Sequence, residues 1–374
     1  MNKKIYLTSP HMSEEGYEKK YIEEAFRTNW IAPLGLNVTC FEDDICSLIG
    51  TKAAVALNSG TSAIHMALKA AEVGEGDVVF CQSLTFSASA NPIIYQKATP
   101  VFIDSDDKTW NMDPQLLEEA FKKYLLLGIK PKAVIIVHLY GIPAEIEELV
   151  NICRKYNTIL IEDAAESLGS LYKGKYTGTF GDYGTYSFNG NKIITTSGGG
   201  MLVSNHEERI QKVRFWSTQS REPVPYYEHH ELGYNYRMSN IIAGIGRGQL
   251  PVLAERIHQK KYIYNYYKES FKGINDIQMM PSNEESDQNC WLSCIKLRGL
   301  MTPTNIINAL KADQIESRPI WKPMHLQPFF QKYDYIGNGI SDDIYNKGLC
   351  LPSDTKMTDR DLERIVDIVI KAYS

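Results

Sequence analysis

Residues 56–68, ALNSGTSAIHMAL, join a short apolar run to an amphipathic segment through the turn Asn58-Ser59-Gly60. We expect a strand to end at this turn and a helix to begin at Thr61. Gly60 lets the backbone turn sharply, and the free amides at the start of the helix can hold an anionic phosphate. Taken alone, the stretch is better explained as a plain turn with serine and threonine caps, so its meaning depends on the rest of the chain.

The same alternation of apolar and amphipathic segments continues along the chain. Strand-like runs are DVVFCQS (77–83), ATPVFIDSD (98–106), KAVIIVHLYG (132–141) and TILIEDAAE (158–166), and helix-like segments are YEKKYIEEAFRTNW (17–30), DPQLLEEAFKKY (113–124) and AEIEELVNICRKY (144–156). This order is typical of a mostly parallel sheet covered by helices. We therefore predict an α/β fold.

The pattern changes near residue 255. A long basic and aromatic helix, LAERIHQKKYIYNYYKESF (253–271), precedes a strand-like CWLSCIKL (290–297) and helix-like segments at 302–313 and 359–373. We predict a large α/β domain over residues 1–255 and a small C-terminal α+β domain over residues 256–374.

The composition excludes several classes of protein. The formal net charge of −5 argues against a nucleic-acid partner, and no apolar run approaches the roughly 18 residues that a membrane helix needs. The N-terminus lacks a secretory signal, and seven scattered cysteines fit a reducing compartment, so we expect a cytoplasmic protein. The cysteines lack the spacing of a zinc site, and the adjacent His229 and His230 do not suggest a metal. We therefore expect no bound metal ion.

Two further strand ends carry polar groups. Glu162 and Asp163 end an apolar run, where one carboxylate can point into a cleft or cap a helix. In SFNGNKIITTSGGG (187–200), a strand reaching Ser187 is followed by a turn that presents Lys192. This loop lacks the Gly-Lys-Ser/Thr order of a phosphate-binding P-loop. The glycines of AGIGRGQL (243–250) miss dinucleotide-binding spacing and are better explained by close helix packing.

These pieces together suit one cofactor. A phosphate cradle at Gly60 and Thr61, an acid at Asp163, a hydroxyl at Ser187 and an amine at Lys192 match the phosphate, ring nitrogen and aldehyde of pyridoxal 5'-phosphate. Lys192 would form the Schiff base, because enclosure and nearby positive charge lower the pKa of a lysine.

One aromatic residue could complete this cofactor site. Phe86 could lie on the face of the cofactor ring, although a core aromatic fits the pattern nearly as well.

An ordered set of motifs supports this interpretation. NSGTSAIHMAL (58–68), LTFSASANPI (84–93), PVFID (100–104), IEDAAESLGS (161–170), GTFGDYGTYSFNGNKIITTSGGGM (178–201) and GYNYRMSNIIAGIGRGQL (233–250) resemble the DegT-type pyridoxal phosphate-dependent nucleotide-sugar aminotransferases over nearly the whole chain. The resemblance implies the aspartate aminotransferase-like fold, called fold type I, and a homodimer with shared active sites.

The resemblance also implies residue roles. The expected cofactor contacts are Gly60, Thr61, Ser62, Phe86, Asp163, Glu166, Ser187, Lys192 and Asn235. Lys192 and Asp163 are the implied catalytic residues, Glu166 would lie by the ring hydroxyl, and Asn235 would be lent by the other subunit. Because related dehydratases have histidine at the lysine position, Lys192 argues for amino transfer.

The resemblance implies glutamate as amino donor and a nucleotide-linked keto sugar as acceptor. NWIAPLG (29–35), TQSREP (218–223) and RPIWKPMH (318–325) are most similar to enzymes that aminate the 4-position of UDP-linked 2-acetamido-2,6-dideoxy-4-keto-hexose for exopolysaccharide or surface glycans. Arg237, Trp321 and His325 are candidate substrate contacts, with structural roles about as well supported. The alternatives are a 3-aminotransferase, an enzyme for dTDP- or GDP-linked keto sugars, or a non-catalytic cofactor-binding regulator.

Overall fold

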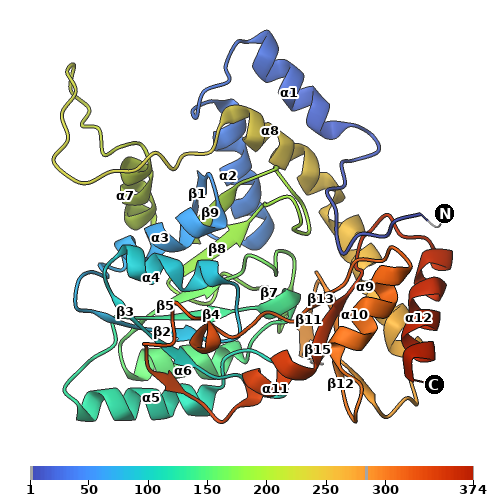
Figure 1. Ribbon diagram of the computed structural model, residues 1–374. Coiled ribbons are helices and arrows are strands. Elements are labelled where there is room, and N and C mark those ends of the chain that lie inside the picture. Colours follow the sequence, from blue (N-terminus) through green and yellow to red (C-terminus); the bar gives the residue numbers. More distant parts are fainter. Residues whose placement is uncertain (1–2, 283–284, 374) are drawn as a thin grey trace.

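The computed structural model describes residues 3–282 and 285–373 and is built on an eight-stranded sheet (Figure 1). In spatial order its strands are β1 (Ala53–Leu57), β9 (Gly200–Ser204), β8 (Tyr183–Ser187), β5 (Ile159–Asp163), β4 (Ala133–Val137), β2 (Val78–Gln82), β3 (Thr99–Ile103) and β14 (Tyr335–Ile336). From β8 to β14 every pairing is parallel, and only β9 runs antiparallel to its neighbours β1 and β8. The predicted mostly parallel sheet is confirmed.

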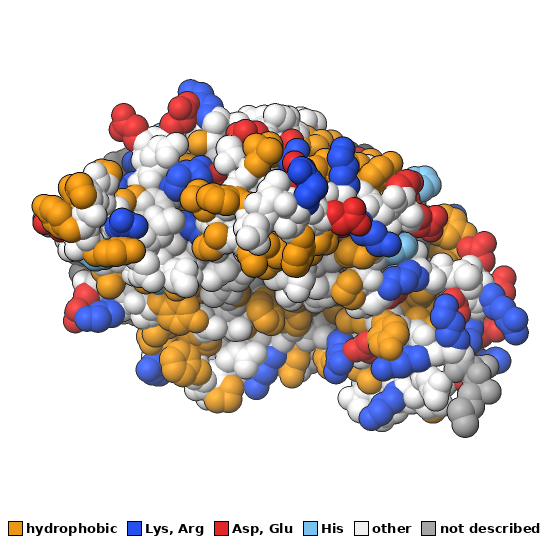
Figure 2. Space-filling model, turned by 90° about the horizontal axis from the view of Figure 1, so that it is seen from above, with side chains coloured by type: hydrophobic (Ala, Val, Ile, Leu, Met, Phe, Trp, Pro, Cys, Tyr) orange, Lys and Arg blue, Asp and Glu red, His pale blue; other side chains and the backbone are white. Residues whose placement is uncertain are grey.

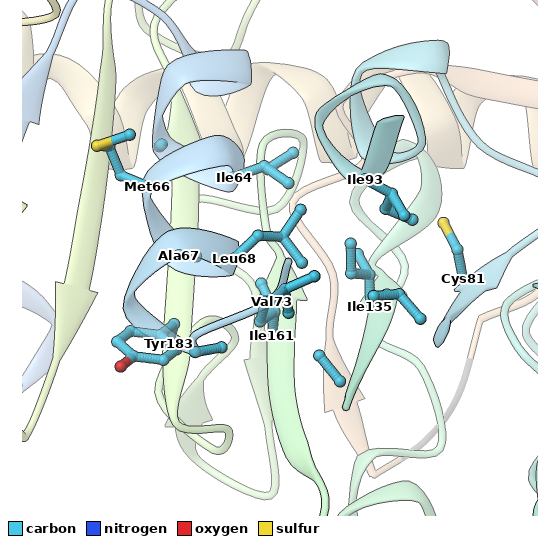
Figure 3. Packing of buried hydrophobic residues seen from close by; sticks show 14 of the residues in the cluster. Ile64, Met66, Ala67, Leu68, Val73, Cys81, Ile93, Ile135, Ile161 and Tyr183 are labelled. Carbon is cyan, nitrogen blue, oxygen red and sulfur yellow. The ribbon is translucent and has the colours of Figure 1, made fainter. Parts of the chain in front are cut away.

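Successive side chains of a strand point to opposite faces of the sheet, and here the side chains on both faces are apolar. Helices therefore cover both faces. On one face, α3 (Gly60–Ala70), α4 (Asn91–Tyr95) and α7 (Glu207–Ser217) pack on side chains such as Val79 and Ile161. Figure 3 shows Ile64 and Leu68 of α3 reaching toward Ile135 and Ile161 of the strands. On the other face, α5 (Pro114–Leu126) and α6 (Ile146–Lys155) bury the alternate strand residues.

A group of three helices covers the end of the sheet formed by β1, β9 and β8, where residues such as Phe41 pack on Ala56 and Met201. It consists of α1 (Tyr17–Arg27), α2 (Leu36–Ile49) and α8 (Asn240–Gln249), and α8 packs against both of the others. A Cβ at Gly246 would lie 2.5 Å from the ring of Phe41, and one at Gly248 2.5 Å from the backbone of Glu18. The prediction that these glycines serve close helix packing is confirmed.

The C-terminal part forms a second layer of structure. An antiparallel sheet of β10 (Ile277–Met279), β12 (Ser293–Leu297), β15 (Gly348–Leu351) and β13 (Arg318–Pro319) packs with α9 (Leu253–Ser270), α10 (Pro303–Ala312) and α12 (Asp359–Tyr373). This is the predicted α+β arrangement. The division at residue 255 stays a prediction, since Ile5 packs in the C-terminal core while β14 joins the large sheet.

Three smaller features complete the fold. A three-stranded sheet pairs β11 (Ser286–Asp287), β6 (Leu171–Tyr172) and β7 (Lys175–Tyr176), and α11 (Ile340–Lys347) precedes β15. Residues 218–236 project from the body after α7 (Figure 1), and the same edge of the molecule is rich in hydrophobic side chains when seen from above (Figure 2). Within residues 3–282 and 285–373, every helix is too short or too polar to cross a membrane.

Candidate active site

A cavity of about 310 Å³ lies at the carboxyl ends of the central strands, where ligands bind in open α/β sheets. It is lined by Ser59, Gly60, Thr61, Ile64, Phe86, Ala88, Asp163, Ala165, Glu166, Ser187, Asn189, Asn191, Lys192, Gly198, Gly199, Trp291 and Trp321. Most of the residues predicted from the sequence therefore meet in one place, although they come from distant parts of the chain.

The first wall of the cavity is the start of α3. Ser59 caps the helix by accepting a hydrogen bond from the Ser62 amide, which leaves the first-turn amides of Gly60 and Thr61 facing the helix N-terminus. A Cβ at Gly60 would come within 3.0 Å of the Ser187 Cβ. The glycine therefore allows the helix N-terminus and the Ser187 hydroxyl to form one anion-binding corner.

The end of β5 presents two carboxylates to opposite faces of the sheet. Glu162 is buried and accepts hydrogen bonds from His138 and from the amides of Gly178, Phe180 and Gly181. Burial raises the pKa of Glu162, but these donors outweigh it and the net pKa is lowered. Glu162 thus secures the strand end, and it is Asp163 that faces the cavity.

Asp163 is held by donors at both oxygens. Ser89 donates to Oδ2 at 2.6 Å and the Ala165 amide to Oδ1 at 3.1 Å. Burial raises the pKa of Asp163, while the hydrogen bond from Ser89 and the charge of Lys192 oppose that rise. The group can act as a fixed negative partner for a cationic ring nitrogen.

Lys192 and Glu166 form the ionisable centre of the cavity. The Lys192 Nζ lies 3.7 Å from the Glu166 Oε1, and Glu166 Oε2 accepts the Tyr140 amide at 2.6 Å. Burial lowers the pKa of Lys192, opposed by Glu166 and Asp163, and burial raises the pKa of Glu166 to about 7. A lowered pKa increases the share of neutral amine, which is the form that a nucleophile or base requires.

Aromatic rings close the remaining side. The ring centroid of Phe86 is 5.4 Å from that of Trp321, and Tyr140 packs 5.0 Å from Trp321 while accepting its backbone amide. Trp291 adds a fourth ring, which lies against Lys192. Sequence reasoning missed Trp291 and Tyr140, because each lies in a segment interpreted as an ordinary strand. It also missed Ser89, which lies within the motif LTFSASANPI (84–93) but was given no role there.

Four predicted residues lie outside the cavity lining. Ser62 bonds to Asn58 within the turn, and Asn235 has an exposed side chain in the projecting segment. Arg237 is buried and pairs with Glu42 at 2.8 Å. The fourth, His325, accepts or donates a 2.7 Å hydrogen bond with Ser83 and stacks on Tyr335.

A larger depression of about 860 Å³ lies at the opposite, amino-terminal ends of the strands. Its cationic groups include Lys132 and Lys212, which pair with Glu72 and Glu231. These pairs lie at the surface, whereas the smaller cavity brings together three deeply buried ionisable groups with shifted pKa values, Asp163, Glu166 and Lys192. The smaller cavity is therefore the better candidate for chemistry.

The donor set fits pyridoxal 5'-phosphate. The helix N-terminus with Ser187 suits the phosphate, Asp163 the ring nitrogen, Phe86 the ring face and Lys192 the aldehyde, and a Cβ at Gly60 would crowd the phosphate corner. A mostly parallel sheet with this lysine and aspartate at its strand ends defines a pyridoxal phosphate-dependent transferase.

Comparison with known proteins identifies the family. Residues 12–370 match the DegT/DnrJ/EryC1/StrS aminotransferase family, and the chain belongs to it. The protein is thus a pyridoxal phosphate-dependent sugar aminotransferase, which confirms the predicted family, fold and cofactor.

Individual relatives cover almost the full chain. EpsN of Bacillus subtilis, named as a candidate pyridoxal phosphate-dependent aminotransferase, is 50% identical over 100% of this chain and 97% of its own length. A GDP-perosamine synthase of Escherichia coli O157:H7 is 35% identical over 99% of both chains. A DegT/DnrJ/EryC1/StrS aminotransferase from Brucella abortus superposes with a TM-score of 0.90 at 26% identity, covering 96% of this chain and 95% of that one.

Proposed function

We propose that this protein transfers the amino group of glutamate to the 4-position of a UDP-linked 2-acetamido-2,6-dideoxy-4-keto-hexose, for exopolysaccharide or surface glycan synthesis. The observation that carries the amino-transfer chemistry is the buried Lys192 amine, 3.7 Å from Glu166 and beside Asp163. The 4-position and the UDP group rest on the similarity of residues 29–35, 218–223 and 318–325 to such enzymes.

The ionisable residues of the cavity have proposed catalytic tasks. Pyridoxal phosphate, when bound, supplies an aldehyde that takes up the amino group and a ring that accepts electrons. Lys192 holds the cofactor and then carries a proton on its Nζ between the reacting carbons. Asp163 keeps the ring nitrogen protonated, and Glu166 lies by the ring hydroxyl.

Three further cavity residues have proposed binding tasks. Gly60, Thr61 and Ser187 bind the phosphate. Ser62 supports this corner through its bonds within the turn.

The substrate side of the cavity is formed by its aromatic wall. Phe86 and Trp321 are two of the four rings in that wall. Phe86 contacts the cofactor ring, and Trp321 contacts the sugar nucleotide. His325 shares a hydrogen bond with Ser83 and so holds the segment that carries Trp321. Arg237 pairs with Glu42, and Glu42 accepts the Ala56 amide of β1, the strand that leads to the phosphate corner. Arg237 is therefore proposed to act by holding this strand in place.

We also propose a homodimer that completes the site. The Asn235 side chain is exposed and belongs to the projecting segment 218–236, which also exposes Tyr227 and Leu232. Trp30 and Leu36 near α1 and α2 expose further apolar surface. Such surface is typical of an interface between subunits.

Spectroscopy tests the reaction class and a substrate panel tests the sugar. The purified protein should be yellow with bound pyridoxal phosphate, and glutamate should convert its absorbance to that of pyridoxamine phosphate. Lys192→Ala should abolish this conversion. The aminated protein should then be offered UDP-, GDP- and dTDP-linked 4-keto and 3-keto sugars, with product mass as the readout. A GDP-linked acceptor is the second candidate, since a GDP-perosamine synthase is 35% identical over nearly the whole chain.

A mixing experiment tests the shared site. Lys192→Ala and Asn235→Ala chains, each inactive or weak alone, should be coexpressed with different affinity tags. If Asn235 serves the partner's site, each mixed dimer contains one intact site, and a random mixture should recover about one quarter of wild-type activity. Lack of recovery would place Asn235 and Lys192 in the same site of one chain.

A further inference from the structure

Trp291 makes two contacts that converge on the cavity lysine. The Lys192 Nζ lies 4.2 Å from the centroid of the Trp291 ring, and the indole N–H donates a 2.7 Å hydrogen bond to the carbonyl of Asn191. Trp291 is 1% exposed, so both contacts are shielded from water. One side chain thus contacts the lysine amine and also holds the backbone immediately before that lysine.

The position of Trp291 is itself fixed by Asn289. The Asn289 Oδ1 accepts the Trp291 amide at 2.9 Å, and its Nδ2 donates to the carbonyls of Glu166 and Leu168. These bonds are buried, and a buried amide whose partners are all satisfied holds one orientation. The C-terminal segment 289–291 is therefore tied to the loop that carries Glu166, the ion-pair partner of Lys192.

We propose that Trp291 is a positioning residue for Lys192, which holds the amine over its ring face and fixes the Asn191 carbonyl so that the amine is aimed at the cofactor. The inference rests on the role proposed above for Lys192. A lysine side chain has a flexible four-carbon stem, and its ammonium gains from an aromatic face most when both are desolvated. Without the ring, the attractive partners left to Lys192 among the described residues are the carboxylates of Glu166 and Asp163.

The ring and the hydrogen bond can be separated by two substitutions. Trp291→Phe keeps an aromatic face but cannot donate to Asn191, and Trp291→Leu removes both contacts. Phe180→Leu is a matched control, since it removes a ring 4.3 Å from the Nζ of Lys175, and neither of these residues lines the cavity.

The experiment measures capture of pyridoxal phosphate by the cofactor-free protein as a function of pH. Borohydride reduction fixes the captured cofactor, and the mass of the peptide containing Lys192 reports the extent at each time. The capture rate reaches a plateau at high pH, where the amine is neutral, and this plateau measures how well the amine is oriented toward the cofactor. The midpoint of the plot of rate against pH measures how strongly the surroundings of the amine favour its ammonium form. Cofactor affinity is measured separately by equilibrium dialysis.

The expected results differ for each variant. Trp291→Leu should lower the plateau rate about tenfold or more and move the midpoint to lower pH by up to about 1 unit, because the ring no longer favours the ammonium. Trp291→Phe should lower the plateau with a smaller change of midpoint, and Phe180→Leu should match the wild type. A residue that only excluded water would show the opposite shift, since water entering the site raises the pKa of a buried lysine.

The outcomes that overturn the inference are distinct. A wild-type plateau and midpoint in Trp291→Leu, or a midpoint that moves to higher pH in both variants, would refute a positioning role while leaving the proposed function intact. If the wild-type protein captures no cofactor at Lys192, the proposed role of that lysine fails and this inference fails with it.

Discussion

Ser89 donates a 2.6 Å hydrogen bond to the Oδ2 of Asp163, and Thr85 shares a 2.7 Å hydrogen bond with the same Ser89 hydroxyl. All three residues are buried. The chain of hydroxyls from the segment after β2 therefore supports the aspartate that ends β5, and it does so from the side of the sheet that carries the cavity.

Replacing Ser89 should shift the pH range in which the protein works. Burial raises the pKa of Asp163 and the Ser89 hydrogen bond lowers it, so Ser89→Ala should raise this pKa further. Because the proposed role requires the ionised carboxylate, activity is lost as pH falls through its pKa. The acid limb of the glutamate half-reaction should therefore move to higher pH, with a rate near neutrality reduced about tenfold.

The neighbouring Ser87→Ala provides a matched control for that measurement. Ser87 lies in the same short helix, η1 (Ser87–Ser89), but is only partly buried. Its profile should equal that of the wild type. An unchanged acid limb in Ser89→Ala would show that Asp163 is held ionised by other groups.

The cofactor-free protein should lose stability as pH rises because of Glu166. Burial raises the pKa of this carboxyl from 4.5 to about 7, so the folded chain retains a proton between about pH 4.5 and 7 that the unfolded chain releases. The contribution of Glu166 is thus most favourable below pH 4.5 and is lost as pH rises through 7. Glu166→Gln removes this dependence.

Thermal unfolding of both proteins across this range tests the sign. The free energy of unfolding of Glu166→Gln minus that of the wild type should increase between pH 5 and pH 8 by an amount on the order of 1–3 kcal/mol. Asp113, a half-buried N-cap acid of α5, has no part in the cavity, and Asp113→Asn should change stability without this pH trend. A difference that decreases with pH would contradict the raised pKa.

The fold, and the meeting of Gly60, Asp163 and Lys192 at one cavity, could be predicted because their signals are local. The turn at Gly60 and the alternation of strands with helices can be read from the spacing of apolar residues. The loop around Lys192 is marked by its nearby glycines. The positions of Arg237 and Trp291 could not be predicted in this way. The buried Glu42 that pairs with Arg237 is 195 residues away, and the Asn191 carbonyl that receives the Trp291 indole is 100 residues away. Such partners are set by tertiary packing, on which a single sequence carries no periodic signal.

The Arg237 pair has its own expected consequence. Arg237→Met leaves Glu42 with one guanidinium partner fewer in a buried site, which should lower the free energy of unfolding by about 3 kcal/mol. Arg214→Met removes the more exposed partner of the same carboxylate and should cost less. In folded protein of both variants, the KM for the sugar nucleotide should equal that of the wild type, and a selective rise for Arg237→Met would restore this arginine as a substrate contact.

The three glycines after the lysine loop lead to the last prediction. A Cβ at Gly200 would lie 2.2 Å from the carbonyl oxygen of Ser59 and 2.6 Å from the Gly60 nitrogen, so the phosphate corner rests directly on this glycine. Gly200→Ala should push the turn away from Ser187, lowering the free energy of unfolding by about 1–3 kcal/mol and weakening pyridoxal phosphate binding roughly tenfold or more.

Gly198→Ala is the matched control for that substitution. Its added Cβ would meet nothing nearer than the Asn58 carbonyl at 4.0 Å, although Gly198 also lines the cavity. Titration of each cofactor-free variant with pyridoxal phosphate, beside a denaturant unfolding curve, separates the two effects. If Gly200→Ala loses stability but binds the cofactor as Gly198→Ala does, then the turn at Ser59 and Gly60 is not the phosphate corner, and the anion must be held elsewhere in the cavity.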